Sequence, residues 1–103
     1  MAWHGVPHGT PANHAWQAYL FAKEWGGRKG VDFKRLQRIV LRADNGECAY
    51  RFARDVKGAN IKKLEATVIR SSDMDAIRKF SLLPGANRQK LENIVLVAQI
   101  LES

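Results

Sequence analysis

Residues 50–65, YRFARDVKGANIKKLE, decide the fold, because most of the stretch recurs in residues 78–92 as RKFSLLPGANRQKLE. Phe52 recurs as Phe80 after 28 positions, whereas the block that begins at Gly58 recurs from Gly85 after 27 positions. The residues of this block that recur unchanged are Gly58, Ala59, Asn60, Lys63, Leu64 and Glu65. A fixed period of this length is typical of stacked supersecondary units, none of which buries its apolar face alone.

The upstream sequence contains a fainter third copy. Phe21 takes the place of Phe52, and Gly30, Asp32, Phe33, Arg35 and Leu36 take the places of Gly58, Asn60, Ile61, Lys63 and Leu64. The sequence therefore predicts three helical hairpins, over about residues 16–45, 48–72 and 76–101, within one domain that spans residues 11–103. Residues 1–10 are predicted to form a flexible N-terminal arm, because they contain two Gly, one Pro and no periodic pattern.

Apolar residues at helical spacing predict helices over residues 11–25, 33–43, 47–56, 61–71 and 73–83, and from residue 88 almost to the end. Asp32, Asn60 and Asn87 each stand where the second helix of a hairpin begins, and such side chains are good N-caps. Ser72 followed by Asp75 is typical of a capping box at the start of the fifth helix. The predicted fold is all-α, with about six helices in three stacked helical hairpins that form a short solenoid-like repeat domain.

The composition is that of an ordinary globular domain, with 46% hydrophobic and 26% charged residues in a chain of 103. A single cysteine excludes an intramolecular disulfide, and no apolar run approaches the ~20 residues that a membrane helix needs. The N-terminus lacks the basic start and apolar block of a secretory signal, so we expect a cytoplasmic, intracellular protein. The net charge of +7 favours an acidic partner, either a nucleic acid or a negatively charged protein surface.

The units resemble the short α-helical repeats, of the form YxFAxxVxGANIxxLE, that recur in uncharacterised bacterial and phage proteins. The resemblance covers about residues 48–98; it is close in the first full unit, whereas the second departs from it at Ser81 and Pro84. It implies stacked helical hairpins and brings no catalytic residues. By analogy, a small protein of this kind is expected to act as an inhibitor that occupies an acidic or nucleic-acid-binding surface of a host protein.

The sequence predicts no enzymatic activity, because paired carboxylates and Ser/His/Asp or Cys/His patterns are missing at spacings that would place them on one face. His4, His8 and His14 are not predicted to bind a metal, since no Cys, Asp or Glu accompanies them. The segment GGRKG, residues 26–30, lacks the preceding strand and the Lys-Ser/Thr ending of a phosphate loop. Cys48 corresponds to Ala76 of the next unit and is therefore expected to be a small packing residue. No cofactor is expected.

Basic residues recur at equivalent positions of the three hairpins, and we call this set the basic ladder. Arg35, Lys63 and Lys90 each occupy the first turn of the second helix in their hairpin, with Lys34 and Lys62 beside two of them. A positive side chain there opposes the helix dipole by about 0.3–1 kcal/mol, so stability alone would favour Asp or Glu. Backbone N–H groups and basic side chains at a helix N-terminus together bind anions. Stacking is expected to align these helix ends along one edge, and the alternative is a solvated basic face without a ligand. The adjoining loops add Arg28, Lys29 and Lys57 to the predicted binding residues.

The last helix departs from the pattern. Its expected buried stripe is Leu91, Ile94, Val95, Ala98 and Leu101. Leu96, Val97 and Ile100 continue the apolar surface around the helix and are predicted to contact a partner or a second copy in a homodimer. The alternative is that this helix packs under the N-terminal segment that contains Trp3, Trp16 and Trp25. Those tryptophans are expected to cover the open end of the stack, and a partner anchor is the other interpretation.

The sequence therefore predicts a non-enzymatic protein–protein interaction module that binds an acidic protein surface. Direct binding of a DNA or RNA backbone is the alternative function. A self-assembling structural protein is a third possibility, which depends on the last helix alone.

Overall fold

The computed structural model describes residues 11–26 and 28–102, and these residues form six α-helices and no strand. The helices are α1 (Pro11–Trp25), α2 (Phe33–Arg42), α3 (Gly46–Asp55), α4 (Ile61–Ser71), α5 (Met74–Phe80) and α6 (Arg88–Glu102). The predicted all-α fold is confirmed. The predicted arm over residues 1–10 lies outside the described residues.

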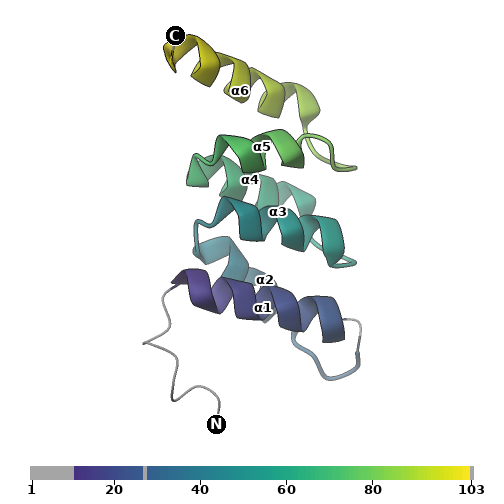
Figure 1. Ribbon diagram of the computed structural model, residues 1–103. Helices are drawn as coiled ribbons and strands as arrows, with labels where there is room; N and C mark the ends of the chain where they lie inside the picture. The colour runs from purple at the N-terminus through teal and green to yellow at the C-terminus, as the bar shows by residue number, and fades with distance from the viewer. Residues whose placement is uncertain (1–10, 27, 103) are drawn as a thin grey trace.

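The helices pair as three hairpins that stack along the long axis of a molecule with principal extents of 49 × 29 × 15 Å (Figure 1). Helices α1, α3 and α5 follow one another in one row, in which α1 packs on α3 and α3 packs on α5. Helix α2 contacts both α3 and α4, whereas α6 packs mainly on α5. Helices α1 and α6 therefore lie at opposite ends of the stack.

The start of the second helix has the same local structure in all three hairpins. The side chains of Asp32, Asn60 and Asn87 accept hydrogen bonds of 3.1 Å from the backbone N–H groups of Arg35, Lys63 and Lys90, respectively. The glycine two residues before each cap, at positions 30, 58 and 85, has a φ of 91°, 85° and 86°, a left-handed conformation that favours glycine. This agreement explains why the glycine recurs in all three copies and why each cap is Asn or Asp.

A hydrogen bond between successive hairpins also recurs, five residues after the cap. Gln37 Oε1 accepts the backbone N–H of Asn60 at 2.7 Å, and Glu65 Oε1 accepts the backbone N–H of Asn87 at 2.6 Å. Both acceptor side chains belong to buried residues. Each of the first two hairpins therefore fixes the start of the next hairpin's second helix through one buried polar side chain.

Replacing Glu65 with Leu is expected to destabilise the fold by about 1–3 kcal/mol, because the N–H of Asn87 is left without an acceptor in a place shielded from water. Glu65→Gln keeps an acceptor, as Gln37 does in the first hairpin, and is expected to cost less than about 1 kcal/mol. Urea unfolding followed by circular dichroism measures both variants. Equal losses from the two substitutions would contradict a role for this hydrogen bond in joining the hairpins.

The core is built from matching positions of the repeat. Phe52 and Phe80 are fully buried, as are Leu64 and Leu91, so equivalent positions of the repeat are buried alike. The ring of Phe33 lies 5.9 Å from the ring of Phe52, centroid to centroid, and joins the first hairpin to the second. Burial of large apolar side chains between hairpins provides the main stabilisation of the stack.

Two local predictions for the fifth helix are wrong. Its N-cap is Asp73, which accepts from the backbone N–H of Ala76, because Ser72 instead ends α4 in a left-handed conformation with φ 60°. The helix ends at Phe80 instead of residue 83. Proline disfavours helical geometry at the residue before it, so Pro84 shortens the helix from its C-terminal side.

Polar contacts fix the end of α3 to α1. The buried Tyr19 donates its hydroxyl hydrogen bond to Asp55. Arg54 donates to both carboxylate oxygens of Asp55, at 2.7 and 2.9 Å, and these hydrogen bonds lower the pKa of that carboxyl to about 2. Asp55 therefore stays ionised at neutral pH and holds the first two hairpins together from the side opposite α2.

Candidate functional site

The N-termini of α2, α4 and α6 lie along one edge of the stack, because the loops that precede them all emerge on the same side (Figure 1). We call this side the basic edge; it consists of Arg28, Lys29, Lys34, Arg35, Lys57, Lys62, Lys63 and Lys90. All eight residues are exposed. The structure therefore brings together the helix ends that carry the predicted ladder.

Ion pairing distinguishes the basic edge from six other cations of the described residues. Within residues 11–26 and 28–102, the Lys and Arg residues that form salt bridges are Arg51, Arg54, Arg70, Arg78, Lys79 and Arg88. None of the eight residues of the basic edge belongs to that set. The nearby carboxylate of Glu92 pairs with Arg88 at 2.7 Å. The positive charge of the edge is therefore not neutralised by carboxylates in the described part of the chain.

The three helix ends differ in their electrostatics. At each of them the cap side chain accepts the N–H of the third helical residue. At α2 the first helical N–H, that of Phe33, also donates to the carbonyl of Val31 at 3.0 Å, so α4 and α6 offer more N–H groups to an anion than α2 does. Asp32 adds a negative charge at the start of α2, whereas the caps of α4 and α6 are neutral Asn60 and Asn87. The start of α4, with Lys62 and Lys63, is therefore best suited to an acidic group.

The sequence analysis missed two arginines on α2. Arg38 and Arg42 are exposed and, together with Asp32, Arg35 and Ile39, line a shallow groove on the outer side of the first hairpin. Neither arginine forms an ion pair within the described residues. The spacing of three and then four residues from Arg35 places them on one helical face and could have revealed them.

The C-terminal half of α6 presents an uncovered apolar surface. Leu96, Val97 and Ile100 are 55%, 54% and 63% exposed, and Leu101, which was predicted to be buried, is 79% exposed. The buried stripe of α6 ends at Val95, because the helix continues beyond α5, which has seven residues against fifteen in α6. Since α1 lies at the other end of the stack, α6 does not pack under Trp16 or Trp25 (Figure 1).

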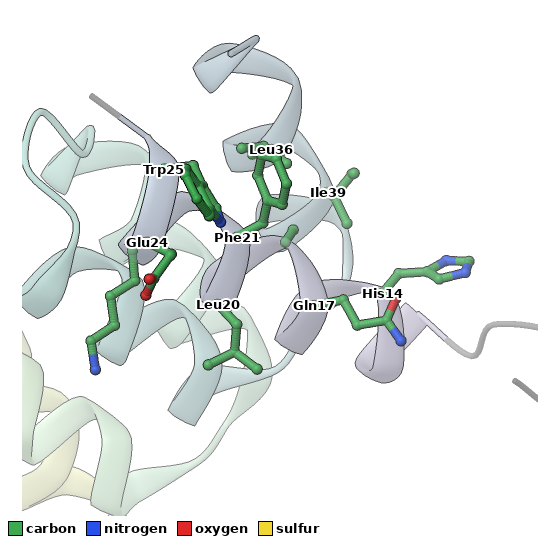
Figure 2. Close-up of a pocket in the computed structure, with 10 residues that line it drawn as sticks. His14, Gln17, Leu20, Phe21, Glu24, Trp25, Leu36 and Ile39 are labelled. Carbon is green, nitrogen blue, oxygen red and sulfur yellow. The ribbon is translucent and has the colours of Figure 1, made fainter. Parts of the chain in front are cut away.

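The opposite end of the stack carries an apolar groove of about 810 Å³ between α1 and α2 (Figure 2). Phe21, Trp25 and Leu36 lie close together, with Ile39 to one side, and Leu20 lines the groove farther away. Phe21 is 49% and Trp25 39% exposed. The tryptophans thus cover this end incompletely: Trp16 is partly buried against the core, Trp25 lines an open groove, and Trp3 lies outside the described residues.

The described residues contain no group of three or more His, Cys, Asp or Glu placed to hold a metal ion. Cys48 is fully buried, as predicted for a packing residue, and burial raises the pKa of its thiol to about 12. Such a thiol is protonated at neutral pH and is not a nucleophile. Within the described residues, none of the helices combines the length and apolarity that crossing a membrane requires.

Comparison with known proteins adds no relative. No family model, curated protein or solved structure matches this chain. The resemblance to bacterial and phage helical repeats therefore stays a prediction.

Proposed function

We propose that the chain is a non-enzymatic protein–protein interaction module whose basic edge binds an acidic surface of a partner protein. The observation that carries this proposal is the separation of charges: six cations elsewhere in the described residues have carboxylate partners, whereas the basic edge has none. Positive side chains at helix N-termini are locally unfavourable, which favours a role in binding over a role in stability. An inhibitor of the phage type, acting inside a cell, is the narrower form of this proposal.

Direct binding of a nucleic-acid backbone is the second candidate, because unpaired Lys and Arg beside positive helix ends also suit phosphates. Base stacking has little support, since several aromatic rings already face cations of the chain itself. Arg51 lies over Trp16 at 5.3 Å and Arg28 lies over Trp25 at 4.4 Å. Tyr50 faces Arg54 at 5.3 Å and Lys79 at 5.8 Å. These contacts favour a ligand recognised by its charge alone.

Titration with two anionic probes at several salt concentrations tests the proposal. We expect a fluorescent poly-glutamate peptide to bind at low ionic strength and to be released as salt screens the basic edge. If the nucleic-acid alternative holds, short duplex DNA should bind more tightly than the peptide at equal salt. Five or six phosphate contacts would give a log–log slope of about −4 to −5. Failure of both probes to bind at low salt would show that the edge is a solvated face and that the proposed function is wrong.

A further inference from the structure

The groove at the α1 end corresponds to a face that is covered elsewhere in the stack. On α2, Leu36 and Ile39 line the groove and are only partly buried. The repeat places Leu64 and Thr67 at the equivalent positions of α4, and these residues are 0% and 2% exposed. The difference arises because the second hairpin packs on a preceding hairpin, whose Leu41 carbonyl accepts the Thr67 hydroxyl hydrogen bond, whereas no hairpin precedes the first within the described residues.

Helix α6 presents at the other end the face with which α2 and α4 hold the next hairpin. The repeat places Glu92 at the position of Gln37 and Glu65, whose side chains accept an N–H from the following hairpin. Leu96 stands at the position of Leu41 and Ile69, which are both partly buried, yet Leu96 itself is 55% exposed. Helix α6 therefore carries the acceptor and the apolar side chain of a stacking interface without a following hairpin.

The matching donor lies at the α1 end. In the second and third hairpins, the N–H of the cap residue donates to the preceding hairpin, from Asn60 to Gln37 and from Asn87 to Glu65. Asp32 is the equivalent cap of the first hairpin, and its N–H donates to no acceptor within the described residues. One end of the stack thus has an N–H without an acceptor in the described residues, and the other has a carboxylate that is held only by Arg88 of its own helix, in the same register of the repeat.

We infer that two copies of the chain associate head to tail, with α6 of one copy in the α1–α2 groove of the next. A contact within the chain serves as the template for this contact: α2 of the first hairpin lies against both α3 and α4 of the second. The bound copy would place Leu96 against Phe21 and bring Glu92 to the N–H of Asp32. Because the two faces differ, the contact is heterologous and leaves one free end on each copy, so larger assemblies form as concentration rises.

The shape and charge of α6 suit this role. At the positions where α2 and α4 end, Asp44 and Ser72 adopt left-handed conformations with φ of 54° and 60°. Gln99 occupies that position in α6 and is helical, so the helix continues and adds Ile100 and Leu101 to the apolar surface. Residues 93–101 contain no charged side chain, so this part of the helix does not repel the arginines beside the groove.

Salt separates this association from binding at the basic edge. Both copies are positively charged, so an apolar contact between them is expected to strengthen as salt screens their mutual repulsion. Binding of an anionic probe weakens under the same change. The two proposals therefore predict opposite salt dependence, and either can fail without the other.

Sedimentation velocity on a complementary pair of variants tests the inference. Phe21→Lys blocks the groove and Leu96→Lys blocks α6, and each alone is expected to be monomeric, with association at least about 10-fold weaker than native. An equimolar mixture restores one intact contact and should form a one-to-one dimer and nothing larger. Leu82→Lys is the matched control, since Leu82 is 72% exposed on neither surface and should leave association unchanged.

Three results would overturn the inference: a native chain that is monomeric at high concentration and high salt, a Phe21→Lys variant that still dimerises through α6 alone, or a mixture that stays monomeric. Circular dichroism identifies a variant that fails to fold. Leu20→Lys and Ile100→Lys, at positions 57% and 63% exposed, form a second pair for which the same complementation is expected.

Discussion

Replacing Arg35, Lys63 and Lys90 with Glu is expected to abolish binding of acidic peptides while leaving the chain at least as stable as before. Each residue is the third of its helix, and its backbone N–H donates to the side chain of the cap residue three positions earlier. Glu at this position interacts favourably with the helix dipole, by about 0.3–1 kcal/mol. The same substitutions place negative charge on the basic edge. If DNA binds, its log–log salt slope should flatten by about 0.9 for each lost contact.

The matched control replaces Arg51, Arg78 and Lys79 with Glu. Both triple variants exchange three positive for three negative charges, so net charge falls equally from +7. The control residues lie on α3 and α5 and already form salt bridges. We expect the control variant to retain probe binding, because the unpaired cations remain. Equal losses of binding in the two variants would mean that net charge, and not the basic edge, attracts the probe.

Sequence periodicity was sufficient to predict the architecture, because each hairpin is specified locally. Asn60 and Asn87 cap helices wherever they precede an apolar stripe, and Gly58 and Gly85 adopt the left-handed turn before them. These signals act over a few residues, so they are readable without knowledge of the stack. The misplaced start of α5 is the exception, since Ser72 and Asp73 are both good caps and the end of α4 decides between them.

The contacts between hairpins could not be predicted from single helices. Nothing in the sequence of α4 alone indicates that Glu65 is buried, and it is buried because the third hairpin places the N–H of Asn87 against it. The groove at the α1 end was missed for the same reason. Leu36 matches the buried Leu64, and it lines the groove because no hairpin packs on it within the described residues. Burial at the ends of a repeat array depends on neighbours, which periodicity does not report.

One property of the basic edge could be predicted from the sequence, and another could not. The repeat predicted that Arg35, Lys63 and Lys90 would occupy equivalent helix ends, and the stack aligns those ends (Figure 1). Ion pairing could not be read from the sequence, because Arg70 pairs with Asp44, 26 residues away, and Lys79 pairs with Glu47, 32 residues away. The lack of carboxylate partners at the edge is therefore information that the three-dimensional structure adds.

Leu64→Ala is expected to destabilise the chain by about 2–5 kcal/mol, the usual loss when a large aliphatic side chain is removed from a packed core. Leu64 is fully buried in the central hairpin, with packed hairpins on both sides. Since a small domain has a free energy of unfolding of about 5–15 kcal/mol in total, this loss removes a large part of its stability. Urea unfolding measures the loss, and a value below about 1 kcal/mol would contradict this position in the core.

Two further Leu→Ala variants show whether the loss of stability depends on burial alone or also on the position of the hairpin in the stack. Leu82 is 72% exposed, so Leu82→Ala is expected to change stability by no more than about 0.5 kcal/mol. Leu91 is buried as completely as Leu64, but its helix α6 has a neighbouring hairpin on one side only. Because stacked hairpins stabilise their neighbours in one dimension, Leu91→Ala should release α6 before the rest unfolds. Hydrogen exchange should then show lost protection confined to α6, whereas Leu64→Ala should lower protection throughout the stack.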